Sequence, residues 1–224
     1  MPLTPAHPAA VLPLRRLGLP LSALVCGAVA PDVPVYLPVV VSYSRTHSWA
    51  GLPYAVVVGL VLLCLWSVLV RDAVVDLVSP LRRRLPRQVR LHRRAWLLAP
   101  VAVAVGAATH VLWDAATHDW GFVVRELSAL RHQAGPLRVH EWLQHLSTAV
   151  GSAVVAAYAV RGLLRLPVTP RPPSAHRPWR WFMPVVLAAL VVGIVRRDPE
   201  AAVGAAMVAL LGVALLWRLR ARRA

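Results

Sequence analysis

Residues 95–118, AWLLAPVAVAVGAATHVLWDAATH, decide the fold of this chain because they join an apolar run to three polar side chains. The run from Ala95 to Trp113 approaches the roughly 20 residues that a helix needs to cross a bilayer. His110 lies inside the run, and Asp114 and His118 follow at four-residue intervals. Helix positions i, i+4 and i+8 drift by only about 40° per step, so the three side chains are predicted to share one helix face.

Two interpretations of this stretch stay open. Ionisable side chains at membrane depth mark a functional site by default, and His110 and Asp114, one turn apart, can reach the same metal ion. Alternatively, a buried His110 is hydrogen-bonded to Asp114, while His118 lies in the water interface. A helix rise of roughly 12 Å separates His110 from His118, so one ion is not expected to bind both.

The composition predicts a multi-pass membrane protein. Of 224 residues, 58% are hydrophobic and 15% charged, and the mean hydropathy is +0.60, which is too apolar for an ordinary soluble domain. The net charge of +16 comes from arginine alone, since the chain has no lysine. The arginines fall between apolar segments, so we expect them to contact anionic lipid headgroups rather than nucleic acid. Cys26 and Cys64 form no disulfide framework or thiolate metal cluster.

We predict an all-α fold, a transmembrane helical bundle with five clear spans at residues 51–70, 95–113, 142–160, 181–195 and 201–217. The apolar segment Leu17–Val41 is expected to form a broken or re-entrant hairpin, because Pro20, Pro31, Pro34 and Pro38 interrupt it. The polar segment 115–141 shows no firm pattern.

The expected domain organisation has three consecutive parts. Residues 1–160 form the membrane domain with the candidate metal site and an arginine-rich loop at 71–94. Residues 161–180 form a connector rich in proline and arginine, and residues 181–224 form a helical hairpin with a basic tail.

The arginine distribution predicts the topology. The loops after the first, third and fifth spans carry eight, five and four arginines, whereas the intervening loops carry three and two. Because positive loops stay in the cytoplasm, we expect a bacterial inner-membrane protein with a cytoplasmic C-terminus. This orientation brings His47, His110 and Asp114 to the outer face.

Histidines and aspartates from distant segments form the candidate ligand set of six residues, namely His7, Asp32, His47, His110, Asp114 and His118. Imidazoles with carboxylates suit zinc, manganese or iron, and such an ion can make a nucleophile of its bound water. Simpler interpretations stay open, because His7 can be an exposed terminal residue, Asp32 a helix cap and His47 an interfacial histidine. The other histidines (His92, His132, His140, His145 and His176) are expected to be solvated. Arg45, Arg125 and Arg138 are expected to contact headgroups.

Four motifs carry a resemblance to a known family: residues 1–10 (MPLTPAHPAA), 27–32 (GAVAPD), 46–48 (THS) and 110–118 (HVLWDAATH). In this order they resemble the bacterial domain-of-unknown-function 4184 family over most of the chain up to about Gly151. More distantly, the chain is similar to LexA-binding inner-membrane proteins regarded as metal-dependent hydrolases. The resemblance implies a multi-pass inner-membrane protein.

The matching positions of this resemblance are His7, Asp32, His47, His110 and Asp114, and His118 matches the first family only. Where the hydrolase group shows Asp-x-Asp-His after the proline, this chain has Asp32-Val33-Pro34-Val35. One or two ligands of that pattern are missing, so we expect one ion.

The leading hypothesis is a hydrolase that acts on an ester or phosphoester of a lipid-like or envelope substrate. A divalent metal, zinc, is held by His47, His110 and Asp114 with His7 or Asp32. No catalytic residue is assigned and no organic cofactor is predicted. The alternative is a non-catalytic scaffold or transport component with a buried polar network. A third hypothesis is that Arg82, Arg83 and Arg84 dock anionic lipid or a partner protein.

Overall fold

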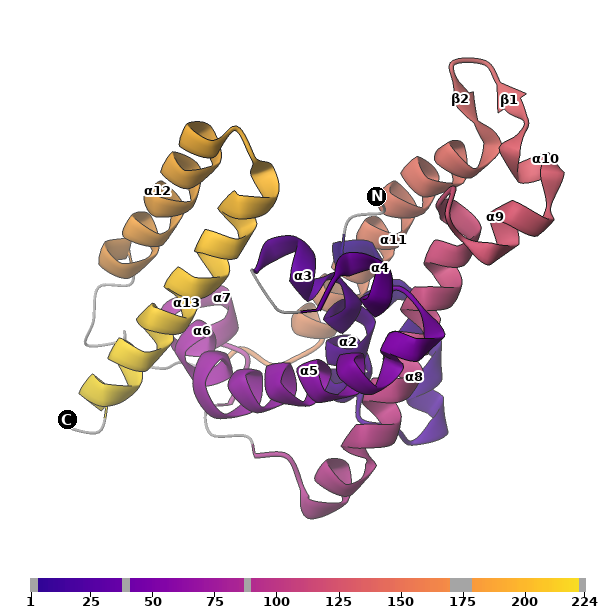
Figure 1. Cartoon of the computed structure of the whole chain (residues 1–224). Helices are drawn as coiled ribbons and strands as arrows, with labels where there is room; N and C mark the ends of the chain where they lie inside the picture. Colours follow the sequence, from indigo (N-terminus) through magenta and orange to yellow (C-terminus); the bar gives the residue numbers. More distant parts are fainter. Residues whose placement is uncertain (1–3, 38–40, 87–89, 170–178, 222–224) are drawn as a thin grey trace. The chain divides into compact units, whose positions relative to one another are not determined.

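The computed structural model describes residues 4–37, 41–86, 90–169 and 179–221, and these residues are helical almost throughout (Figure 1). This confirms the predicted all-α fold. The helices are α1 (Pro8–Val11), α2 (Leu21–Val29), α3 (Val33–Tyr36), α4 (Tyr43–Thr46), α5 (Leu52–Leu65), α6 (Arg71–Leu77), α7 (Ser79–Arg82), α8 (Arg93–Thr117), α9 (Phe122–Glu126), α10 (Ser128–Arg131), α11 (Val139–Leu164), α12 (Trp179–Arg196) and α13 (Pro199–Ala221). Short 3₁₀ turns cover Thr4–Ala6, Pro13–Leu17, Ala30–Asp32 and Trp49–Gly51, and Trp66–Val70 is π-helical.

One small hairpin was not predicted. Strands β1 (Gln133–Ala134) and β2 (Leu137–Arg138) pair antiparallel within the polar segment 115–141. Gly135, in the turn, has a φ of 70°, which a glycine adopts without steric cost.

Among the described residues, four stretches are long and apolar enough to cross a membrane by their length and composition: Trp49–Leu77, Arg93–Glu126, Val139–Leu164 and Pro199–Arg220. They contain four of the five predicted spans. Helix α12 contains the fifth prediction, although several of its side chains lie outside the described residues. Apolar side chains on α5 and α11 are more than half exposed, among them Val57, Val61, Leu146 and Val150. Such faces suit lipid better than water.

The N-terminal segment is broken at two of its prolines, Pro20 and Pro31, whereas Pro34 lies within α3. Helix α2 begins after Pro20 and ends at Val29, and Pro31 and Asp32 then form a 3₁₀ turn before α3. Pro38 lies outside the described residues. The turn matters for the site because it carries Asp32.

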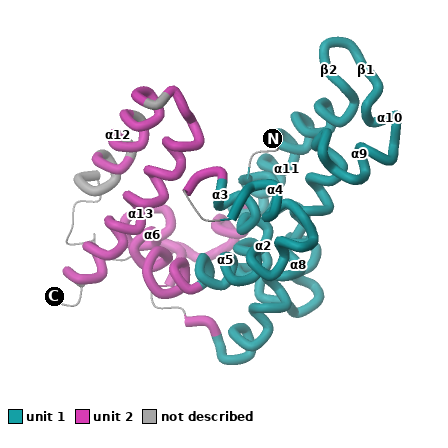
Figure 2. The backbone as a smooth tube through the Cα atoms, in the orientation of Figure 1, with its two compact units in different colours: residues 1–34, 39–63, 92–160 teal, residues 35–38, 64–91, 161–224 magenta. Residues whose placement is uncertain are grey.

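The chain divides into two compact units (Figure 2). The first holds residues 1–34, 39–63 and 92–160, and the second holds residues 35–38, 64–91 and 161–224. All six candidate metal-ligating residues belong to the first unit. The division into consecutive domains at residues 160 and 180 stays a prediction.

The first unit is built around the contact between α2 and α8. Glycines allow the two backbones to approach closely, since a Cβ at Gly27 would overlap the carbonyl oxygen of Val103, and one at Gly106 would overlap that of Leu24. Leu24 and Val103 are fully buried beside this crossing. The close approach brings the backbone carbonyl of Ala28 on α2 within hydrogen-bond distance of His110 on α8.

The second unit has its own core. Val70, Ala73 and Leu77 pack against Ala214 of α13. Beside them, the indole nitrogen of Trp217 donates a hydrogen bond of 2.9 Å to the carboxylate of Asp76.

Candidate metal centre

The structure brings together the histidines and aspartates that the sequence analysis singled out. His7 precedes α1, Asp32 ends a 3₁₀ turn, His47 follows α4, and His110 and Asp114 lie one turn apart on α8. All five side chains are buried, with exposed fractions between 1% and 4%. The exposed, terminal interpretation of His7 is therefore wrong.

Four ligand atoms form the centre of this cluster. The Nε2 of His47 lies 3.1 Å from Oδ1 of Asp32 and 3.4 Å from Oδ2 of Asp114. The Nε2 of His110 lies 3.5 Å from the same Asp32 oxygen and 3.2 Å from the same Asp114 oxygen. The two Nε2 atoms are 3.1 Å apart. Zinc ligands at about 2.0–2.2 Å form a tetrahedron with edges of about 3.3–3.6 Å, so each of these five separations is close to a tetrahedral edge.

The backbone fixes the protonation of both imidazoles. The Nδ1 of His110 lies 2.7 Å from the carbonyl oxygen of Ala28, and the Nδ1 of His47 lies 3.0 Å from that of Tyr43. A carbonyl oxygen only accepts, so each Nδ1 must donate. When both imidazoles are neutral, their Nε2 lone pairs face each other and two carboxylate oxygens. Four acceptors at these distances repel one another unless a metal ion, or a proton on one Nε2, lies among them.

The hydroxyl groups of two threonines contact the candidate ligands. Thr4 donates a hydrogen bond of 2.6 Å to Oδ2 of Asp32, which leaves Oδ1 directed at the histidines. The hydroxyl of Thr46 donates to the carbonyl oxygen of Pro31 at 2.9 Å and lies 3.1 Å from Nδ1 of His47. Such partners orient metal ligands and tune their affinity.

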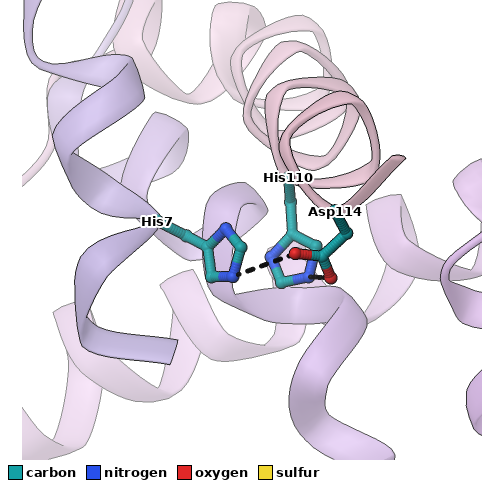
Figure 3. Close-up of side chains that lie close together, drawn as sticks. All are labelled: His7, His110 and Asp114. Carbon is teal, nitrogen blue, oxygen red and sulfur yellow. Dashed lines mark ion pairs between the residues drawn. The ribbon is translucent and has the colours of Figure 1, made fainter. Parts of the chain in front are cut away.

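His7 approaches the other carboxylate oxygen of Asp114. Its Nε2 lies 3.6 Å from Oδ1 of Asp114, and its ring stacks on His110 with centroids 3.7 Å apart (Figure 3). Burial, together with the neighbouring His110, lowers the pKa of His7 to about 4, so its imidazole is neutral at pH 7. His7, His110 and Asp114 thus form a second set of residues that could hold a metal ion, overlapping the set of Asp32, His47 and His110.

His118 differs from its prediction. Helix α8 ends at Thr117, and His118 has extended backbone angles (φ −122°, ψ 145°), so it does not continue the helix face of His110 and Asp114. Its side chain is nevertheless buried, and its Nδ1 lies 3.5 Å from Oδ1 of Asp114. His118 therefore lies beside the centre, although neither three-residue set includes it.

Three of the remaining histidines, His92, His132 and His145, are exposed as predicted, and His176 lies outside the described residues. The prediction is wrong for His140, which is buried near the start of α11. Its Nδ1 lies 3.0 Å from the carbonyl oxygen of Leu130.

Aromatic rings around the centre had no signal in the sequence. The ring of Tyr43 lies 3.8 Å from that of His47, and Trp120 lies 5.8 Å from His47 and 5.0 Å from His118, all between ring centroids. Tyr43 precedes His47 by four residues at the start of α4, whereas the turn after Thr117 sets the position of Trp120.

Thr46→Val tests whether the hydroxyl group of Thr46 orients His47. Valine keeps the shape of the buried side chain and removes the hydroxyl group that contacts His47, so zinc affinity is expected to fall about 10–100-fold. Competition with a zinc-chelating dye measures this affinity. Thr169→Val, at an exposed position of the second unit, is the control. Equal affinities of the two variants would show that Thr46 does not orient His47.

Comparison with known proteins gives one match. No curated protein and no solved structure matches the chain. A family model matches residues 1–219, which include all six candidate metal-ligating residues. The more distant resemblance to LexA-binding proteins stays a prediction. Because the match spans nearly the whole chain, the protein belongs to the family described as Domain of unknown function (DUF4184).

Proposed function

We propose that this membrane protein is a metal-dependent hydrolase whose divalent ion, zinc, is bound by His47, His110, Asp114 and Asp32. One observation carries the proposal. Five separations among the four ligand atoms lie between 3.1 and 3.5 Å, and both imidazoles direct their Nε2 atoms inward. Two histidines with carboxylates are a ligand set that zinc prefers.

A zinc ion in this position would act as a Lewis acid that activates water for attack on an ester or phosphoester. Catalytic zinc needs a position for water, and zinc can expand to five ligands. The ligand shell allows this opening most readily at Asp32, because Thr4 already holds its second oxygen. The Nε2 of His7 lies near Oδ1 of Asp114, the other oxygen of that carboxylate. His7 can therefore hold the Asp114 carboxylate in place when water replaces Asp32.

The proposed setting is a bacterial inner membrane with the metal centre towards the outer face and the C-terminus in the cytoplasm. The arginine-rich loops support this orientation. His47 just precedes the stretch Trp49–Leu77, and His110 and Asp114 lie in the C-terminal half of Arg93–Glu126. A centre in this place favours lipid-like or envelope substrates over soluble ones.

The activity is tested with the full chain in detergent micelles and 4-methylumbelliferyl esters of phosphate and of fatty acids. Hydrolysis is expected to stop after treatment with EDTA and to return with zinc. Asp114→Asn should lower the rate at least about 100-fold, since it removes a metal ligand itself rather than a residue that only orients a ligand. His145→Ala, at an exposed position, is the control. Hydrolysis that persists in EDTA and in Asp114→Asn would contradict the proposal.

A second candidate function is a non-catalytic scaffold. Hydrogen bonds from the cluster join distant segments, since Thr4 bonds to Asp32 and His110 bonds to Ala28. Buried networks of this kind stabilise a bundle without chemistry. In that case the wild-type protein retains no metal after zinc supplementation, and His110→Ala lowers thermal stability in detergent. A stable His110→Ala variant would argue against this candidate.

Anionic lipid is the proposed partner of the arginine-rich segment, but Arg82 is not available for this contact. Arg82 is buried and donates a hydrogen bond of 3.0 Å to the carbonyl oxygen of Asp76, so its side chain serves the second unit. Arg83 is exposed and suits headgroups.

A further inference from the structure

A pocket of about 300 Å³ lies in the first unit beside the metal centre. Its walls come from residues 44–49, around the end of α4, and from residues 111–125, at the end of α8 and in α9. His47 belongs both to the wall of the pocket and to the ligand cluster. A molecule in the pocket therefore touches the imidazole whose Nε2 faces Asp32 and Asp114.

Arg125 gives the pocket its charge. It is the one acidic or basic side chain among the lining residues other than His47, and it is exposed on α9. Ser44 and Ser48 also line the pocket. A guanidinium favours an anion, and its planar donors match the oxygens of phosphate.

Three aromatic residues, Trp49, Trp120 and Phe122, also line the pocket, beside the small or aliphatic Val111, Ala115 and Gly121. Trp49 and Phe122 line the pocket and are 49% and 42% exposed. Trp49 begins one membrane-length stretch, and Phe122 lies near the C-terminal end of another. Exposed aromatic rings at the ends of spans lie at the depth of lipid headgroups. The pocket thus combines a cation for a phosphate with rings for an apolar neighbour.

We infer that this pocket binds the phosphate headgroup of an interfacial amphiphile, with Arg125 as the residue that recognises the phosphate. The inference rests on the proposed function in one respect, because it names the substrate class of the same centre. Arg125 contacts the phosphate, the aromatic wall contacts the glycerol and the first acyl carbons, and the scissile ester lies towards His47.

The test uses metal-free protein in dodecyl maltoside, so that binding is measured without hydrolysis. Isothermal titration calorimetry follows three probes: dihexanoyl phosphatidic acid, dihexanoylglycerol and inorganic phosphate. Phosphatidic acid is expected to bind the wild type, and Arg125→Gln should weaken it at least about 10-fold, as expected for a charge-assisted hydrogen bond. Arg138→Gln removes the same charge from an exposed position outside the pocket and should leave binding unchanged.

The outcomes separate this inference from the metal proposal. His110→Ala should lose zinc yet still bind phosphatidic acid, so a failed metal proposal leaves the binding result intact. Equal losses in Arg125→Gln and Arg138→Gln would overturn the inference, since they would show attraction to surface charge in general. Binding of dihexanoylglycerol or of inorganic phosphate as tight as that of phosphatidic acid would also overturn it. Tight binding of dihexanoylglycerol would show that the phosphate is not recognised. Tight binding of inorganic phosphate would show that the lipid part is not recognised.

Discussion

His110→Ala is expected to abolish zinc retention. His110 is the residue that both three-residue sets share, so its loss leaves neither set complete. We expect the zinc affinity to fall at least about 100-fold, which exceeds the usual loss when a residue that only orients a ligand is replaced. Inductively coupled plasma mass spectrometry of detergent-purified, desalted protein measures the zinc content.

Two variants control this result. His145→Ala removes an exposed histidine of α11 and should keep the wild-type zinc content. Asp114→Asn keeps the shape of the side chain, removes its negative charge and should lose zinc as His110→Ala does. Zinc contents that do not differ between His110→Ala and His145→Ala would place the metal elsewhere.

Gly106→Ala is expected to destabilise the first unit by about 1–3 kcal/mol, the usual cost of excess volume in a packed core. The added Cβ would overlap the carbonyl oxygen of Leu24 and push α2 away from α8. This movement also withdraws the carbonyl of Ala28 from His110, so zinc affinity should fall together with thermal stability.

The matched variant is Gly162→Ala. A Cβ at Gly162 meets no atom within 4 Å, and alanine is favoured over glycine in a helix by about 1 kcal/mol. The two substitutions are therefore expected to have opposite signs in thermal unfolding followed by circular dichroism. If Gly106→Ala is as stable as Gly162→Ala, the close crossing of α2 and α8 does not hold the site.

The sequence predicted the spans and one local pair of the site. Long apolar runs have few alternatives to a helix in a membrane, which is why residues 51–70 and 95–113 lie within observed helices. His110 and Asp114 could be paired from their spacing alone, because helix geometry places i and i+4 on one face. The prediction that Asp32 and His47 lie near that helix face required the membrane topology and the family resemblance as well.

The details that the sequence did not reveal are set by backbone positions outside the regular helices. His118 leaves the helix because α8 ends one residue earlier, and no apolar pattern marks that end. The carbonyls of Ala28 and Tyr43, which fix the two imidazoles, carry no side-chain signal. The hairpin of β1 and β2 is too short to show strand periodicity.

Zinc K-edge absorption of the zinc-loaded full chain tests the shared ligand shell of Asp32, His47, His110 and Asp114 most directly. We predict one retained ion with four or five nitrogen and oxygen ligands at about 2.0–2.2 Å, including the scattering of two imidazoles. A spectrum with sulfur ligands, a spectrum without imidazole scattering, or a chain that retains no zinc would contradict the account.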